Sequence, residues 1–166
     1  MSEYKRFFIQ QQRRVGSSYQ NVGSTVDTYE TYHVVCQESA FKHLPEAKEL
    51  PSTQWYDEDG DDVYVPPEGT KIDAYDLEIT FLYVGTEESM SSDIKQFIEF
   101  MYGRNDGGSS EFCYYDEYTG TGRRCCYTKS VEDELFIYNN SDTEALAKFT
   151  MVIRVNDPIT DWEVEE

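Results

Sequence analysis

A strict alternation of apolar and polar side chains over Ala74–Val84 constrains the fold of this chain more than any other segment. The apolar positions are spaced two residues apart: Tyr75, Leu77, Ile79, Phe81 and Tyr83. Successive side chains of a strand point to opposite faces, so this spacing predicts a strand with one buried face. Ala147–Val155 has the same pattern and predicts a second such strand. Pro158 lies just beyond its end, and proline stops a strand because it has no N–H for the ladder.

A single helix is predicted at about residues 92–102. Its apolar side chains recur at helical spacing and form one stripe, which must pack on a sheet: Ile94, Phe97, Ile98 and Met101. Ser91 or Ser92 can cap the N-terminus, and Asp93 suits the positive end of the helix dipole. Gly103 supplies a residue that can turn left-handed after the last helical turn.

The remaining predicted strands are shorter. Glu111–Asp116 and Arg123–Ser130 are expected to pair around the turn at residues 119–122. Three further candidates are Lys5–Ile9, Tyr29–Cys36 and Leu135–Tyr138. About seven strands and one helix in a chain of 166 residues, the length of one domain, predict a mainly β (α+β) fold. We expect a β-sandwich or a partly closed barrel with the helix packed against it, as a single domain over residues 1–166.

The charge of the chain is strongly acidic, with 33 acidic and 14 basic residues and a formal net charge of -19. Tight binding of free duplex DNA or RNA relies on Lys and Arg neutralising phosphates, so nucleic acid is not expected as a specific ligand. Basic residues concentrate within residues 1–16, where only Glu3 opposes Lys5, Arg6, Arg13 and Arg14. This basic N-terminal arm either docks on another copy of the chain or is a solvated chain end.

No apolar leader follows Met1, and no apolar run approaches the roughly 20 residues of a membrane-spanning helix. We therefore expect no membrane partner, and synthesis and folding in a reducing cytoplasm. None of the cysteines lies in a CxxC spacing, which favours free buried thiols: Cys36, Cys113, Cys125 and Cys126. A Cys113–Cys126 disulfide across the predicted hairpin is an alternative that the geometry of strands allows.

A calcium loop is the metal-site pattern that the sequence comes nearest to. Four carboxylates fit positions 1, 3, 5 and 12 of such a loop: Asp57, Asp59, Asp61 and Glu68. The loop requires glycine at position 6, where Asp62 stands, and Pro66 with Pro67 prevents the exiting helix. Two other interpretations remain open, namely a solvated acidic loop and a contact with the basic arm of another subunit.

Catalytic constellations are missing from the sequence. His33 and His43 are its only histidines, and neither lies in a metal-binding spacing. Gly120 and Gly122 are explained by the geometry of a hairpin turn rather than by phosphate binding. Carboxylates are so abundant that no pair is singled out as acid and base. We therefore expect a protein that is not an enzyme and that holds no cofactor.

Five segments, taken in order, resemble small tail proteins of tailed bacteriophages and prophages. They are WYDEDGDD, AYDLEITFLYVG, QFIEFMYG, EFCYYDEYTGTGRR and KFTMVIRVNDPITD. Together they extend over roughly Trp55–Asp161, and the best-matching positions are Gly103 and the turn Thr119–Arg123. The family that they resemble is the distal-tail and tail-tube structural superfamily. No motif of residues 1–54 matches, and the second, carbohydrate-binding-like domain of longer distal-tail proteins has no counterpart in the sequence.

The resemblance implies a virion structural protein without enzymatic activity. It implies a homo-oligomeric, usually hexameric, ring in a phage tail, as distal-tail hub or tail-tube component. Other tail proteins are the implied partners, and genomic DNA passes through the lumen without specific binding. Synthesis and assembly in the cytoplasm of the bacterial host follow from the same resemblance.

Two hypotheses concern the acidic loop. In the first, carboxylates within Asp57–Asp62 face the lumen of the ring and repel the phosphates of passing DNA. The second belongs to a rival function, in which Asp57–Glu68 binds calcium and stabilises an extracellular or cell-surface binding module.

Overall fold

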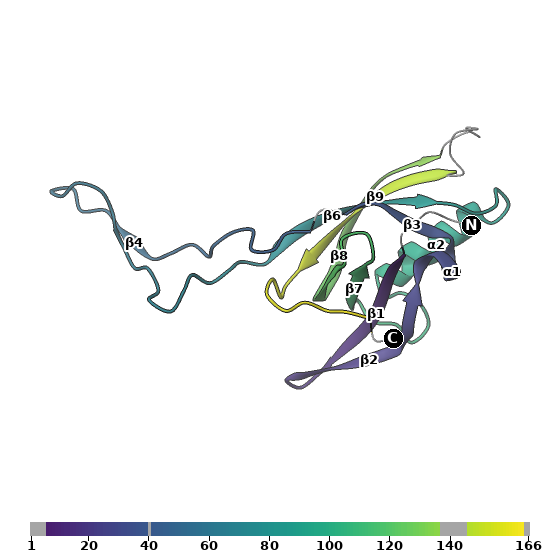
Figure 1. The fold of residues 1–166 in the computed structure, drawn as a ribbon, viewed down its shortest axis with the longest axis horizontal. Coiled ribbons are helices and arrows are strands. Elements are labelled where there is room, and N and C mark those ends of the chain that lie inside the picture. The colour runs from purple at the N-terminus through teal and green to yellow at the C-terminus, as the bar shows by residue number, and fades with distance from the viewer. Residues whose placement is uncertain (1–5, 40, 137–145, 165–166) are drawn as a thin grey trace.

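Residues 6–39, 41–136 and 146–164 are described by the computed structural model (Figure 1). Seven antiparallel strands form one sheet in the order β2-β1-β7-β8-β9-β6-β3. Their bounds are β1 Phe7–Val15, β2 Ser18–Asp27, β3 Val34–Ser39, β6 Tyr75–Tyr83, β7 Glu111–Asp116, β8 Thr121–Phe136 and β9 Ala147–Val155. The two strands with the clearest alternation, β6 and β9, lie side by side, in register from Tyr75↔Val155 to Tyr83↔Ala147.

The sheet curls around a core that its own strands share. Phe7 of β1 and Phe81 of β6 meet edge to face with ring centroids 5.2 Å apart, although β7, β8 and β9 separate their strands in the sheet. The Thr28 hydroxyl lies 3.2 Å from the Phe7 carbonyl and 2.8 Å from the Val34 carbonyl, which brings the start of β1 near the start of β3. The sheet does not close, since β2 and β3 remain its edge strands. The expected mainly β fold with a partly closed sheet and one main helix is confirmed.

The main helix, α2, is Met90–Met101, and it packs on the core side of the sheet. The Phe97 ring lies 5.2 Å from Phe81 and 5.9 Å from Phe149. The predicted stripe is confirmed except at Ile98, which is only partly buried, while Phe100 is buried instead. Phe100 is buried because the ring of Tyr32 covers it, with the two ring centroids 5.7 Å apart. The sequence pattern does not reveal this neighbour.

The ends of α2 differ in how well they were predicted. The N-cap is Ser89 rather than Ser91 or Ser92, and its side chain makes no capping hydrogen bond. Asp93 lies in the first turn as expected, where its carboxylate accepts a 2.7 Å hydrogen bond from the Tyr83 hydroxyl. Gly103 adopts φ +73° and the Arg104 N–H bonds back to the Glu99 carbonyl at 2.8 Å, so the predicted helix end is confirmed.

The strand predicted over Tyr29–Cys36 is wrong in its first half. Thr28–Tyr32 form a short helix, α1, because the Asp27 carboxylate caps it by accepting a 3.0 Å hydrogen bond from the Tyr29 N–H. His33 then takes a left-handed conformation with φ 57°, and β3 begins after it. Among the described residues, neither helix is both long enough and apolar enough to span a membrane.

The segment expected to be a basic N-terminal arm, residues 1–16, continues into the sheet. From Phe7 onward it is β1, paired with β2 on one side and β7 on the other, and both Phe7 and Ile9 are fully buried. Arg13 and Arg14 lie at the exposed end of the β1–β2 hairpin. Docking of this basic segment on another copy stays a prediction, as does the treatment of residues 1–166 as a single domain.

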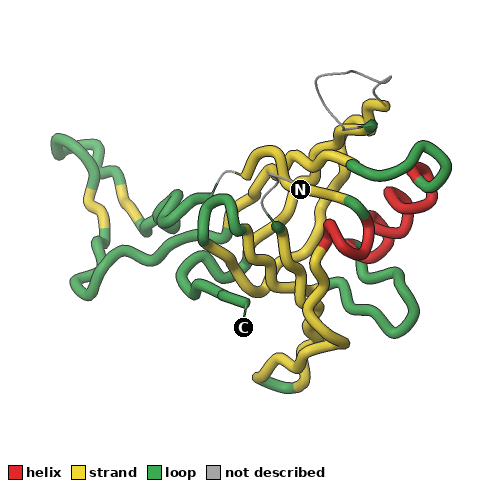
Figure 2. The backbone as a smooth tube through the Cα atoms, turned by 45° about the vertical axis from the view of Figure 1, so that its right-hand side comes forward, coloured by secondary structure: helices red, strands yellow, loops and turns green. Residues whose placement is uncertain are grey.

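A long extension, residues 41–74, leaves the sheet between β3 and β6 (Figures 1 and 2). It carries a small ribbon made of β4 Ser52–Thr53 and β5 Asp62–Val63. In both views the extension projects from the end of the molecule opposite to α2. No apolar periodicity in this stretch predicts it, because its side chains line no core.

Candidate assembly surfaces

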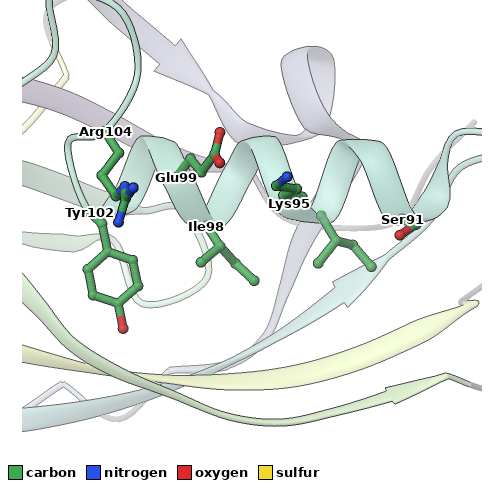
Figure 3. Close-up of a pocket in the computed structure, with 7 residues that line it drawn as sticks. Ser91, Lys95, Ile98, Glu99, Tyr102 and Arg104 are labelled. Atoms are coloured by element: carbon green, nitrogen blue, oxygen red, sulfur yellow. The ribbon is translucent and has the colours of Figure 1, made fainter.

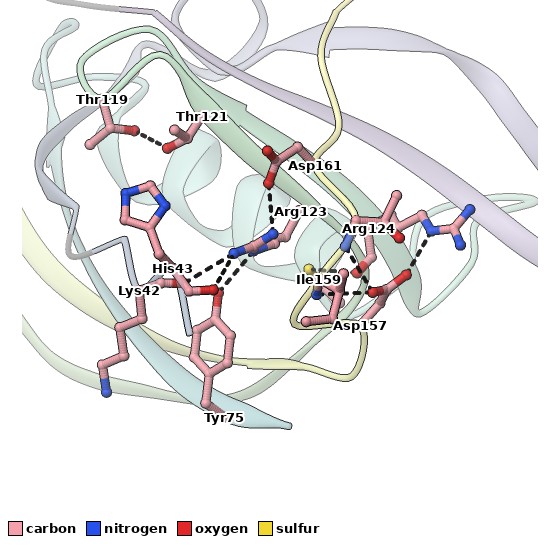
Figure 4. Close-up of polar contacts among 12 residues, drawn as sticks. Lys42, His43, Tyr75, Thr119, Thr121, Arg123, Arg124, Asp157, Ile159 and Asp161 are labelled. Atoms are coloured by element: carbon pink, nitrogen blue, oxygen red, sulfur yellow. Dashed lines mark hydrogen bonds and ion pairs between the residues drawn. The ribbon is translucent and has the colours of Figure 1, made fainter. Parts of the chain in front are cut away.

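A buried arginine holds the root of the extension to the sheet (Figure 4). The Arg123 side chain is 2% exposed, and its Nη2 donates to the carbonyls of Lys42 and His43, both at 3.1 Å. Its Nη1 donates to Asp161 Oδ1 at 2.7 Å, and its Nε donates to the Tyr75 hydroxyl at 3.3 Å. One cation therefore connects β8 with the first residues of the extension, the start of β6 and the C-terminal segment.

Neighbouring groups compensate the buried charge of Arg123. The ring of Phe41 faces the guanidinium at 4.5 Å, a cation–π geometry. Asp161 supplies the countercharge while its own side chain stays 68% exposed to water. Burial raises the pKa of the Tyr75 phenol, and the hydrogen bond from Arg123 offsets part of that rise. This cluster fixes the direction in which the extension leaves the sheet.

The C-terminal segment, residues 156–164, packs along β8 next to this cluster (Figure 4). The Asp157 carboxylate accepts hydrogen bonds from the Ile159 and Thr160 N–H groups at 3.2 and 3.0 Å, and from Arg124 Nε at 2.9 Å. Burial acts to raise the pKa of Asp157, but the hydrogen bonds prevail and hold it below its usual value. These hydrogen bonds of Asp157 stabilise the turn that follows β9.

The two legs of the extension are joined by backbone hydrogen bonds at two levels. Near the root, the Lys48 N–H donates to the Lys71 carbonyl at 2.8 Å, and the Asp73 N–H donates to the Glu46 carbonyl at 2.9 Å. Further out, the Tyr64 N–H donates to Pro51 at 3.0 Å beside the β4–β5 pair. Residues 51–65 are all exposed, so no hydrophobic core supports this part of the extension.

The four candidate calcium ligands lie on the extension, and each is exposed: Asp57, Asp59, Asp61 and Glu68. The three aspartates lie between β4 and β5, whereas Glu68 lies beyond β5 on the returning leg. Within the described ranges, no three His, Cys, Asp or Glu side chains gather in a group that could hold a metal ion. Calcium binding here stays a prediction, which a calcium titration followed by thermal unfolding checks.

A groove of about 630 Å³ runs along the flank of α2 (Figure 3). The residues that line it include Ile94, Lys95, Ile98, Glu99, Tyr102 and Arg104. Ile98 and Tyr102 are partly buried and make its floor apolar, whereas Lys95 and Arg104 are exposed. Neither the Lys95 ammonium nor the Arg104 guanidinium has a hydrogen bond or ion pair with another residue in the part of the chain that the structure describes. The groove therefore combines an apolar floor with two cations that form no ion pair and with one carboxylate, that of Glu99.

The cysteines and histidines take structural positions. All four thiols are free and buried, which confirms the expectation, and burial raises the pKa of Cys113 to about 12. A thiol with such a pKa is a poor nucleophile near neutral pH. His33 Nδ1 lies 3.2 Å from Asp93 Oδ2, and the His43 ring packs edge-on against Phe41 at 4.8 Å.

The sequence predicts few of the residues that form the extension root and the α2 groove. For Arg123 a signal existed, because two adjacent arginines on a strand point to opposite faces and one of them must face inward. For Lys95, Tyr102 and Arg104 no such signal exists, since the groove depends on how α2 is rotated against the sheet.

Comparison with known proteins shows a likeness of fold. No protein-family model matches this chain, and no curated protein matches it. Its structure is similar to the crystal structure of the SPP1 Dit protein (gp 19.1), described as a paradigm of the hub adsorption apparatus in phages that infect Gram-positive bacteria. The TM-score is 0.54 at 14% sequence identity, over 91% of this chain and 50% of Dit. The chain therefore shares the fold of that phage hub protein and spans half of its length.

Proposed function

We propose that this protein is a structural component of a bacteriophage tail, that it is not an enzyme, and that it works by assembling into a homo-oligomeric ring. The observation that carries the proposal is the fold shared with SPP1 Dit over 91% of the chain. The sequence resemblance to small phage tail proteins over Trp55–Asp161 is an independent argument for the same class. Within that class, a six-fold ring serving as distal-tail hub or tail-tube component is the form we propose.

The shape of the molecule supports assembly. The extension projects from the body, its tip is exposed, and its root is held by the buried Arg123. Ordering such a segment costs folding free energy, and in a monomer no contact at the tip would offset that cost. In a ring, by contrast, each subunit contacts its neighbours through two different surfaces, and a projecting extension can supply one of them. The proposed partners are other copies of the chain and other tail proteins, and the proposed location is the virion after assembly in the host cytoplasm.

The acidic composition supports passage of DNA without retention. A channel that conducts DNA must not bind its phosphates, and carboxylates bordering the lumen repel them. A net charge of -19 supplies enough carboxylates for this purpose even if only part of them border the lumen.

The test is the solution mass of the purified protein, measured by light scattering over a range of concentrations, together with negative-stain images of the same sample. We expect a mass of six times 19.4 kDa and rings with a central hole wide enough for duplex DNA. A protein that stays monomeric throughout and gains thermal stability on addition of calcium contradicts the proposal and supports the rival binding module.

A further inference from the structure

The exposed part of the extension combines aromatic side chains with carboxylates that form no ion pair with any described residue. Trp55, Tyr56 and Tyr64 are 53%, 103% and 62% exposed. No Lys or Arg lies between Lys48 and Lys71, whereas that stretch contains seven carboxylates: Glu49, Asp57, Glu58, Asp59, Asp61, Asp62 and Glu68. Aromatic residues are enriched at protein–protein interfaces, so this surface has the composition of one half of an interface. Its partner surface must be basic.

The extension also lacks support of its own. Strands β4 and β5 have two residues each, and residues 51–65 are exposed throughout. A two-stranded ribbon of this size is marginal in water unless another surface covers it. Exposed large aromatic side chains on such a ribbon and its loop are typical of a surface that a partner covers.

The α2 groove has the complementary properties. Ile98 belongs by sequence to the apolar stripe of the helix, yet it lies partly uncovered beside Tyr102 (Figure 3). Lys95 and Arg104 border the same groove, and among the described residues neither has an anionic partner. The groove therefore offers an apolar floor to aromatic rings and two cations to carboxylates, and its lining stays positive overall because Glu99 is the one carboxylate in it.

We propose that the extension of one copy docks in the α2 groove of a neighbouring copy. Its aromatic side chains pack on Ile98 and Tyr102, and its carboxylates face Lys95 and Arg104. A chain cannot dock on itself in this way, because both views place the extension and α2 at opposite ends of the molecule (Figures 1 and 2). The inference rests on the ring proposed above and names the two surfaces that join its subunits.

The placement of the two surfaces determines the kind of assembly. A contact between two different surfaces at opposite ends of a subunit is head-to-tail, and it generates a closed ring when the rotation between subunits closes and a filament when it does not. This proposal assigns the carboxylates of Asp57–Asp62 to a subunit contact, in place of the hypothesis that they face the lumen.

The rival receptor on the same molecule is the basic pair Arg13 and Arg14. Arg14 is already engaged, with Nη2 2.6 Å from the Tyr19 hydroxyl and 3.8 Å from Glu111 Oε2. Arg13 donates to the carbonyls of Gly107 and Gly108 at 3.5 and 3.3 Å. These contacts leave the pair less free to bind carboxylates of another chain than Lys95 and Arg104 are.

A charge-swap experiment on full-length protein tests the contact. One variant carries Lys95→Glu and Arg104→Glu, and a second carries Asp57→Lys, Asp59→Lys and Asp61→Lys. Light scattering of each alone should give the monomer mass, because like charges then meet in the groove. An equimolar mixture should recover the wild-type mass, because each acidic extension meets a native groove and each basic extension meets an acidic one. Circular dichroism confirms that both variants are folded.

The matched control is the double variant Arg13→Glu/Arg14→Glu, which changes the net charge by the same amount at the rival site. It should keep the wild-type mass. If this control becomes monomeric while Lys95→Glu/Arg104→Glu still assembles, the docking site is wrong and the basic N-terminal segment is the receptor. If the wild type assembles and no variant changes its mass, the ring stands and the contact proposed here is wrong. If the wild type itself never assembles, the proposed function is contradicted first.

The aromatic half of the contact has its own test. Trp55→Ala should weaken assembly about tenfold or more, as truncation of a central interface residue does. Tyr118→Ala, which removes a 65% exposed ring at the β7–β8 turn, should leave the assembly constant unchanged. Equal effects of the two substitutions contradict a specific role for the extension.

Discussion

Arg123 joins four residues that lie far from it in the sequence: Lys42, His43, Tyr75 and Asp161. Its guanidinium bonds to partners between 38 and 81 positions away in the sequence. We expect Arg123→Met to lose about 2–3 kcal/mol of unfolding free energy, because two carbonyls and a phenol then lack a buried donor. The midpoint of thermal unfolding should fall by roughly 5–10 °C.

Arg124→Met is the control for that substitution, since it makes the same chemical change one residue later. Arg124 is exposed and forms a single ion pair with Asp157, so its loss should cost less than about 1 kcal/mol. If both variants unfold at the same temperature, Arg123 is not the connecting residue that the geometry indicates.

Asp157 gives the stability of the protein a predictable dependence on pH. Its pKa is lowered in the folded state, so its contribution is present above the pKa of the unfolded chain, about 4, and is lost as the pH falls through the folded value. Asp157→Ala should therefore cost about 1 kcal/mol at pH 7, and the difference from wild type should shrink below about pH 4. Urea unfolding at a series of pH values measures this. Asp59→Ala, which removes an exposed carboxylate of the extension, controls for net charge.

Among the elements, α2 depends on how it ends. Gly103 has φ +73°, and a Cβ there would collide with the backbone of Ser109 and Ser110. Gly107 has a similar φ of +67°, but a Cβ there meets nothing. We expect Gly107→Ala to cost about 1–2 kcal/mol from backbone strain alone, and Gly103→Ala to cost clearly more. Thermal unfolding of the two variants separates strain from collision, and equal losses would show that the collision is relieved by a shift of the loop.

The elements that could be predicted are those whose packing leaves a period in the sequence. Strands β6 and β9 alternate because one face of each is buried, and α2 has its stripe for the same reason. Strand β2 has no such pattern, since most of its side chains are exposed. The pattern of Tyr29–Cys36 predicts a strand where helix α1 lies, because it does not show that the cap of Asp27 outweighs the strand preference of the residues that follow.

The candidate surfaces were harder to predict than the sheet, for a physical reason. Their acidic half was visible as a run of carboxylates, but the extension that presents it has no period, because nothing in its own chain packs on it. The basic half involves Lys95 and Arg104, which come together only through the turn at Gly103 and the rotation of α2. Tertiary arrangement of this kind leaves no local trace in a sequence.

At the scale of the whole molecule, charge and shape act together. The body is acidic apart from a few places, so copies repel one another at long range, and only complementary patches overcome that repulsion. Contacts between exposed charges are screened by salt, and we expect the assembly constant of the wild type to fall when ionic strength is raised from 0.1 M to about 1 M. Sedimentation at both salt concentrations measures it, and an assembly that strengthens at high salt would point to a purely apolar contact.

Each subunit has an extension at one end, which binds one neighbour, and a groove at the other, which receives the extension of a second neighbour. A copy with one of the two disabled can join a growing arc but offers no place for a successor, so it acts as a chain terminator. A small fraction of the extension variant, Asp57→Lys/Asp59→Lys/Asp61→Lys, added to wild-type protein should therefore stop arcs before they close, and light scattering should record a lower mean mass. A variant that carries both sets of reversals recognises neither wild-type surface and should leave wild-type assembly untouched. A closed ring is no longer sensitive to the variant, because it has no free end to which a defective subunit can bind.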